Sequence, residues 1–245
     1  MDFTNLLVGF EFEFTAKYDK KQLMQLLRNE LKLPFCGKKS TRWEIHNDSS
    51  VEIKLIAHAA HELVSPPQPY NIAIQTLHRI CNWMKSHDCR TNSSTGLHVS
   101  MSFKEPELNT KIDPIKLIVF TPSEILNQFK RQRNYYCMSY QQDFKKWSRY
   151  FKHEAVENWQ QAADVLRDRL KLHKEKYRIV NINKLYEHQY VEFRAVGNKN
   201  YHQRIDEIYD TIKRLAKALL ISVDSNSHVV QYKKAIESYM NILTA

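Results

Sequence analysis

The stretch Leu6-Leu-Val-Gly-Phe-Glu-Phe-Glu-Phe14 alternates aromatic and acidic side chains. Successive side chains of a β-strand point to opposite faces, so this alternation predicts a strand with one apolar and one acidic face. The phenylalanines would pack into a core, and Glu11 and Glu13 would share the other face. Such a face is costly unless something binds there, so the stretch predicts a sheet that carries a site.

Two later fragments repeat this arrangement with other polar groups. In Gly96-Leu-His98 and the residues that follow, His98 would lie on one strand face with apolar side chains behind it. In Val191-Glu-Phe-Arg194, the side chains of Glu192 and Arg194 would point the same way. If these strands are neighbours, the polar face of the sheet carries carboxylates, an imidazole and a guanidinium.

Composition predicts one domain with a preference for anions. The 245 residues are 42% hydrophobic, which is enough for a substantial core, and with only 4 glycines and 7 prolines no flexible linker is evident. We therefore expect residues 1–245 to form a single domain. The net charge of +10 favours contact with a nucleotide, an acidic peptide, a nucleic acid or a membrane surface, and does not choose among them.

The cysteines and the hydropathy pattern exclude several classes of protein. The 4 cysteines have no CxxC spacing, which argues against structural zinc and a disulfide scaffold. No apolar run approaches the ~20 residues that a membrane span needs, and the first residues lack a basic leader. We expect a soluble, cytoplasmic protein without a membrane partner.

Periodicity along the chain predicts an α+β fold. Apolar residues recur at helical spacing in residues 19–31, 70–87, 154–174, 201–223 and 229–243. Strand patterns occupy residues 6–14, 43–46, 51–56, 61–64, 96–103, 178–183 and 190–196. Further helix starts are predicted at Asp113-Pro114 and, as a capping box, at Thr121-Pro122-Ser123-Glu124. This order favours a mainly antiparallel sheet that is covered by helices on one face.

Residues 131–150 mix aromatic and basic side chains. A nucleic-acid-binding protein could use such a segment to stack bases and follow phosphates. The favoured interpretation is a helix with aromatic core contacts and a solvated basic face.

The polar residues of the predicted strands form a set that suits a metal bound with a nucleotide. Magnesium and manganese prefer oxygen ligands, sometimes with one imidazole. The candidate ligands are Glu11, Glu13, Glu62, His98 and Glu192. Each one alone is better explained as a solvent-facing or hydrogen-bonded residue, so the weight comes from the combination.

Cationic and turn residues add weaker candidates. Arg194 could hold a transferring phosphate or form a salt bridge with a neighbouring glutamate. Arg131, Arg133 and Lys176 are candidate anion contacts, and each could equally be a solvated surface charge. Asp48 could orient an amine, ligate a metal or simply form its turn.

Taken in order, these pieces resemble the amidoligase family, which belongs to the carboxylate–amine ligases related to glutamine synthetase and glutamate–cysteine ligase. The resemblance covers most of the chain. It rests on Gly9-Phe-Glu-Phe-Glu13, Trp43 to Asp48-Ser49, Glu62-Leu-Val-Ser-Pro66, Gly96-Leu-His-Val99, Arg131-Gln-Arg-Asn-Tyr-Tyr-Cys137, Lys176-Tyr177 with Asn181, and Glu192-Phe-Arg194. Any single motif is nonspecific, but the full set in this order is hard to obtain by chance.

The resemblance implies a glutamine-synthetase-like curved sheet whose open concave face holds ATP and Mg²⁺, with Mn²⁺ as a substitute. It implies a bacterial or bacteriophage ligase that activates a carboxylate as an acyl phosphate, which an amine then attacks. By motif position, the five candidate ligands bind the metals, and Arg194 contacts phosphate with Arg131 or Arg133 assisting. Lys176 and Asn181 are expected near the nucleotide, and Asp48 on the amine side.

The chain departs from many relatives at Ser100, where they carry a second histidine. A substrate contact is therefore expected to be lost or replaced there. Two other functions stay open: a phosphotransferase on the same scaffold, as in guanidino kinases, and a noncatalytic basic protein that binds nucleic acid. The carboxylate and amine substrates, whether small molecule, peptide or protein, are not specified by these residues.

Overall fold

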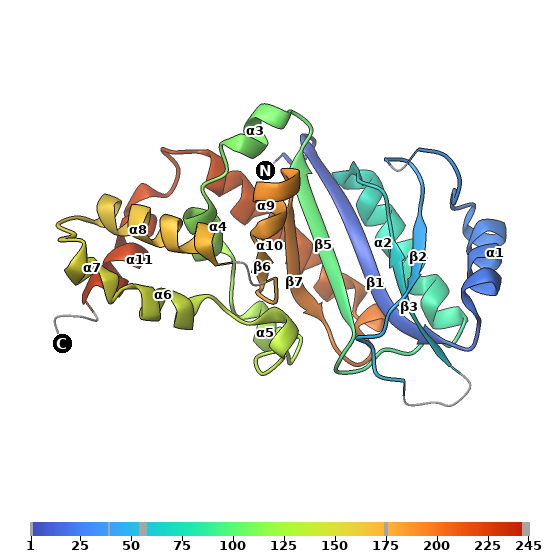
Figure 1. Cartoon of the computed structure of the whole chain (residues 1–245). Coiled ribbons are helices and arrows are strands. Elements are labelled where there is room, and N and C mark those ends of the chain that lie inside the picture. The colour runs from blue at the N-terminus through green and yellow to red at the C-terminus, as the bar shows by residue number, and fades with distance from the viewer. Residues whose placement is uncertain (1, 39, 54–57, 174–175, 242–245) are drawn as a thin grey trace.

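The acidic strand lies inside an antiparallel sheet. The structure is a computed structural model that describes residues 2–38, 40–53, 58–173 and 176–241. The order of the main sheet is β2-β3-β1-β5-β7-β6, and the short strand β4 pairs with β1 (Figure 1). The strands are β1 (Leu6–Ala16), β2 (Glu44–Asn47), β3 (Ala59–Val64), β4 (Gln68–Pro69), β5 (Gly96–Phe103), β6 (Val180–Asn181) and β7 (Val191–Gly197).

Helices account for most of the remaining chain. Those before β7 are α1 (Lys20–Leu31), α2 (Tyr70–Ser86), α3 (Pro106–Thr110), α4 (Pro114–Phe120), α5 (Ile125–Gln128), α6 (Gln141–Trp147), α7 (Tyr150–His153), α8 (Trp159–Leu172) and α9 (Asn183–His188). Those after it are α10 (Ile205–Val223) and α11 (Val229–Asn241). Two 3₁₀ turns, η1 (Tyr135–Cys137) and η2 (Tyr201–Gln203), complete the described elements. The α+β class with an antiparallel sheet is confirmed.

Helices pack against the apolar face of the sheet. Phe10, Phe12 and Phe14 are at most 1% exposed, as the alternation in β1 predicts. Helix α2 contacts β1 and buries Leu77 and Ile80, and Figure 1 shows α2 and α10 behind the sheet. The opposite face of the strands is therefore left for the polar side chains.

Local capping signals fix two of the predicted helix starts. Asp19 accepts a hydrogen bond from the backbone of Gln22, whose side chain accepts from the backbone of Asp19, which completes a capping box for α1. Asp113 caps α4 through the amides of Ile115 and Lys116, with proline at the first helical position.

Three element predictions need correction. Residues 51–53 form no strand, because Glu52 donates its amide to the Ser94 hydroxyl and its carbonyl accepts from Asn92; the rest of that predicted strand, residues 54–56, lies outside the described residues. The capping box at Thr121 is absent, because the Thr121 hydroxyl donates back to Leu117 at the end of α4.

The third correction concerns residues 154–190. Helix α8 begins at Trp159, where Asn158 caps it, and not at residue 154. The expected strand at 178–183 shortens to β6, and the unpredicted helix α9 separates it from β7. Within the described residues, no helix combines the length and apolar character that crossing a bilayer requires.

Candidate metal and phosphate site

Three neighbouring strands bring the acidic residues and the histidine together. In the pairing of β1 with β5, Glu11 lies opposite His98, and in the pairing of β1 with β3, Glu13 lies opposite Glu62. Residues opposite each other in antiparallel strands have their side chains on the same face. Register and alternation together therefore place these four side chains on one patch of the sheet. We call these four residues, together with the nearby Asp48, the carboxylate cluster.

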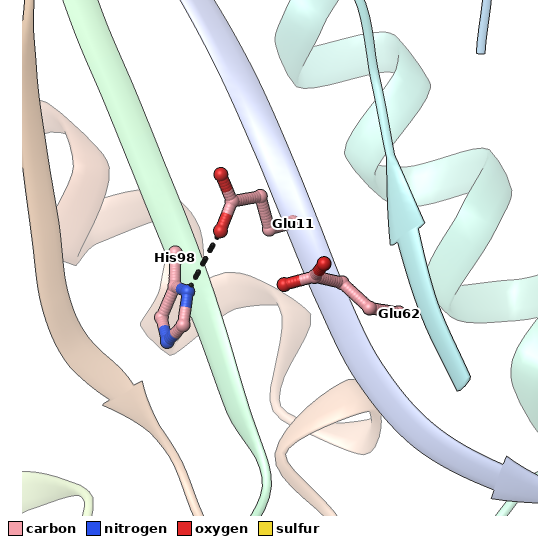
Figure 2. Close-up of side chains that lie close together, drawn as sticks. All are labelled: Glu11, Glu62 and His98. Carbon is pink, nitrogen blue, oxygen red and sulfur yellow. Dashed lines mark hydrogen bonds and ion pairs between the residues drawn. The ribbon is translucent and has the colours of Figure 1, made fainter. Parts of the chain in front are cut away.

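Two groups of donor atoms in this cluster, which have Glu62 in common, are each close enough to hold a cation. One atom each from Glu11, Glu62 and His98 lie within 4.8 Å of one another, and the same holds for Glu13, Asp48 and Glu62. Figure 2 shows that Glu11, from the neighbouring strand β1, and Glu62, from β3 on the far side of β1, both point toward His98. Asp48, which follows β2, is oriented by its own turn, where its carboxylate accepts from the amide and hydroxyl of Ser50.

His98 bridges two carboxylates. Its Nδ1 lies 2.9 Å from Glu11 Oε2, and its Nε2 lies 3.3 Å from Glu13 Oε1. Burial of the ring disfavours its charged form, but the charges of Glu13 and Glu11 outweigh burial and raise the pKa of His98. Conversely, burial opposes ionisation of Glu11, and the hydrogen bond and charge of His98 outweigh it and lower its pKa.

Gly96 allows the histidine to approach Glu13. The amide of Gly96 donates to Glu13 Oε2 at 2.5 Å, and a Cβ at this position would lie 3.0 Å from His98 Nε2 and 3.2 Å from Glu13 Oε2. A side chain at residue 96 would therefore crowd both groups. The glycine of Gly-Leu-His thus has a steric role in the site.

The carboxyl group of Glu62 is difficult to ionise in this cluster. Burial, together with the charges of Glu11, Glu13 and Asp48, raises its pKa to about 7. Mutual repulsion of carboxylates is relieved when a divalent cation binds between them. The oxygen donors and one imidazole are the ligand set that magnesium or manganese accepts, so the residues present fit such an ion.

Glu192 and Arg194 form a second, adjoining group. Arg194 lies with Nη1 2.5 Å from Glu192 Oε1 and donates its Nε to the carbonyl of Tyr136 at 3.1 Å. Asn181 Nδ2 lies 3.5 Å from the same Glu192 oxygen, whereas Asn181 Oδ1 is buried and finds no hydrogen-bond partner in the described chain. An acceptor left in this state is expected where a ligand supplies the donor or cation.

A sequence model of one protein family, described as "Putative amidoligase enzyme", matches residues 4–216. The chain belongs to this family. No curated protein and no solved structure matches it. For a member of the amidoligase family, the site residues predicted from the sequence can be compared with their positions in the structure.

The structure brings Glu11, Glu13, Glu62 and His98 together on one face of the sheet, with Asp48 beside them, and their role as metal ligands stays a prediction. Glu192 pairs with Arg194 and lies outside the two ligand groups. The sequence allowed Arg131 to be a solvated surface charge, but the structure shows that its side chain is buried. It is 2% exposed and donates to the Thr95 and Val196 carbonyls at 2.7 and 3.1 Å. Its expected contact with phosphate stays a prediction.

The remaining predicted cations, Arg133 and Lys176, lie at the protein surface. Arg133 is exposed and lines a pocket with Tyr135 and Tyr136. Lys176 is exposed, with its Nζ 5.2 Å from the centre of the Tyr177 ring. Tyr177 in turn lies 6.0 Å from the Arg194 guanidinium.

Sequence reasoning missed two supporting groups. The Tyr201 hydroxyl, fully buried, donates to the carbonyl of Glu13 at 3.0 Å and fixes the end of β1. The Tyr136 carbonyl orients Arg194 as described above. Neither has a local signal, because a backbone acceptor has no residue type, and the helical periodicity of residues 201–223 does not indicate which group the Tyr201 hydroxyl contacts.

Proposed function

We propose that the protein is an ATP- and magnesium-dependent carboxylate–amine ligase that forms an amide bond through an acyl phosphate. The observation that carries the proposal is the convergence of Glu11, Glu62 and His98 within 4.8 Å, in a chain of the amidoligase family. Carboxylate oxygens are hard ligands of the kind that bind a magnesium ion together with substrate phosphates. The guanidinium of Arg194, which lies nearby, would bind the negative charge of the same phosphate.

Each group has a distinct role in this proposal. Glu11, Glu13, Glu62 and His98 would hold magnesium, which when bound would neutralise phosphate oxygens of ATP. Arg194, kept in place by Glu192 and the Tyr136 carbonyl, faces the developing charge of the transferring phosphoryl group. Because the reaction has little covalent chemistry for the protein to perform, positioning and electrostatics are its main contribution.

The bonds made and broken define the products. The γ-phosphoryl group passes from ATP to a carboxylate oxygen of the substrate, and ADP leaves. The amine nitrogen then attacks the carbonyl carbon, and phosphate leaves with the former carboxylate oxygen as the nitrogen loses a proton. We assign the acceptance of that proton to Asp48, because its carboxylate lies beside Glu13 and Glu62 and is the kind of group that acts as a general base.

Isotope transfer tests this sequence of steps. A pool of carboxylates labelled with ¹⁸O is incubated with amines, ATP and magnesium, and phosphate and products are analysed by mass spectrometry. A ligase gives ¹⁸O-labelled phosphate and a product whose mass is the sum of the two substrates less water. A product that instead gains phosphate would identify a phosphotransferase.

Variants tie the reaction to the carboxylate cluster. Glu13→Gln should abolish phosphate release, because it removes a ligand charge while keeping the size of the side chain. Glu105→Gln, an exposed residue before α3 whose side chain makes no capping bond, is the matched control and should react normally. Unchanged activity of Glu13→Gln would contradict the proposal.

Two observations argue against nucleic-acid binding through residues 131–150. Tyr140, Phe144 and Trp147 are buried, so their rings are not available to stack on bases. Tyr135 and Tyr150 are exposed, and the Tyr150 ring is covered by Arg169 at 3.7 Å. The aromatic residues of this segment serve mainly as core contacts.

A further inference from the structure

A pocket with a net positive charge lies beside the Arg194 group, with which it shares Tyr136. It measures about 340 Å³ and lies between the turn that precedes β5 and the segment that follows α5. Its two walls are joined by a hydrogen bond from Asn134 Nδ2 to the Ser93 carbonyl at 3.0 Å. The Glu52 amide donates to the Ser94 hydroxyl and fixes a third side. We call this space the basic pocket.

Two cations of the basic pocket have no ion-pair partner in the described part of the chain. Lys130 and Arg133 are both exposed and line the pocket together with one carboxylate, that of Glu52. The Lys130 backbone is fixed, because its carbonyl accepts from Asn198 Nδ2 at 3.1 Å and its φ is +54°. Two cations and one carboxylate leave an excess of one positive charge.

The other groups in the pocket are suited to a small polar ligand. Ser93 offers its hydroxyl and Asn134 the second hydrogen of its amide nitrogen, whereas the Ser94 hydroxyl already donates to Asn92. The ring of Tyr135 is 60% exposed at the wall. A guanidinium beside neutral donors is an effective receptor for a carboxylate or a phosphate. The lining therefore favours an anionic group on a compact ligand.

Both walls lead directly to the carboxylate cluster. Tyr136 lines the basic pocket, and its carbonyl accepts from Arg194, which holds Glu192. Ser94 lies two residues before Gly96, whose amide donates to Glu13. The backbone of Tyr136 and the turn before Gly96 thus connect the lining of the basic pocket to Arg194 and Glu13.

We propose that the basic pocket binds a second carboxylate of the ligase substrate, which is therefore an acidic amino acid or an acidic peptide. The inference rests on the proposed function, in which the triphosphate of ATP occupies the metal ligands and Arg194. That placement leaves the pocket to the other substrate. The single excess positive charge matches one carboxylate better than the several charges of a nucleotide phosphate chain.

Binding of a defined probe tests the inference without turnover. Glu-Glu dipeptide is titrated into ¹⁵N-labelled protein, and the amide shifts of Ser93, Ser94 and Asn134 are followed by NMR. We expect shifts at these amides with Glu-Glu and none with Gln-Gln. In the double variant Lys130→Gln/Arg133→Gln, the dissociation constant for Glu-Glu should rise about ten-fold or more, because charged hydrogen bonds are lost.

A charge-matched variant and a nucleotide analogue complete the design. Lys20→Gln/Lys21→Gln, at the exposed start of α1, removes two positive charges elsewhere and should leave the dissociation constant unchanged. Affinity for magnesium and a nonhydrolysable ATP analogue should change less than about two-fold in the double variant, because the nucleotide lies elsewhere. Retained spectral dispersion shows that each variant is folded.

Several results would overturn the inference. They are failure of Glu-Glu to bind the wild-type protein, equal binding of Glu-Glu and Gln-Gln, and equal binding by wild-type protein and the double variant. Loss of the ATP analogue in the double variant would assign the pocket to the nucleotide and also overturn it. If the wild-type protein did not bind the nonhydrolysable ATP analogue, the proposed function would fail. The dipeptide titration would still show whether the basic pocket binds a carboxylate.

Discussion

Replacing Glu62 by glutamine should stabilise the metal-free protein, although the same change should remove function. The pKa of Glu62 rises from its ordinary value of 4.5 to about 7, because burial and the charges of Glu11, Glu13 and Asp48 disfavour its ionised form. Between about pH 4.5 and pH 7, Glu62 is therefore protonated in the folded state but ionised in the unfolded state. Stability falls as pH rises through this window.

The magnitude follows from the width of the window. One pH unit corresponds to about 1.4 kcal/mol for a single proton, so ionising Glu62 costs the folded state at most about 3 kcal/mol above pH 7. Solvent reaches part of the side chain and screens its neighbours, so we expect about 2 kcal/mol. No hydrogen bond to the Glu62 carboxylate forms within the described residues, so glutamine removes the charge without removing a bond.

Urea unfolding with a chelator present, between pH 4.5 and pH 8, measures this effect. Glu62→Gln should match the wild-type protein near pH 4.5 and exceed it by about 2 kcal/mol at pH 8. The surface control Glu105→Gln should show no such pH-dependent difference. The reasoning is refuted if Glu62→Gln is less stable than wild type at pH 8, or if the difference does not vary with pH.

Three further predictions concern the frame of the site and its metal. Gly197→Ala should lose about 2–4 kcal/mol of stability, because a Cβ there would lie 1.6 Å from Arg131 Nη1. In Gly9→Ala, the control, the nearest contact is 3.8 Å, and equal melting temperatures of the two variants would contradict the steric argument. Tyr201→Phe removes the bond to the Glu13 carbonyl and should cost about 1 kcal/mol in urea unfolding; wild-type stability would show that this bond contributes nothing. Manganese affinity, followed by calorimetry, should weaken below about pH 7 as protons compete for the carboxylate and imidazole ligands, and an affinity independent of pH would argue against these ligands.

The sequence predicted the parts of the site that follow from strand alternation and local capping. Glu11 and Glu13 lie on one face because β1 is a regular strand with a phenylalanine core behind it. Asp19 and Asp113 begin helices because their bonds join residues that are near in sequence. Even the neighbourhood of His98 could be expected, although its register opposite Glu11 could not.

The failures share a physical cause, which is that long-range contacts override local preference. Thr121 has the right spacing for a cap, but the preceding helix already takes its hydroxyl. Glu52 lies in a strand-like segment, yet its amide and carbonyl bond to the turn before β5. Arg131 is buried because the glycine at 197 leaves room for its guanidinium, and no pattern around residue 131 encodes that space.

Manganese binding measured by electron paramagnetic resonance tests the central claim most directly. We predict that the wild-type protein binds Mn²⁺, that a nonhydrolysable ATP analogue tightens this binding, and that the Glu11→Gln/Glu62→Gln variant loses both effects. Glu105→Gln should behave as wild type. The account would be contradicted if the wild-type protein bound no Mn²⁺, or if the double variant bound the ion and the analogue as tightly as the wild type does.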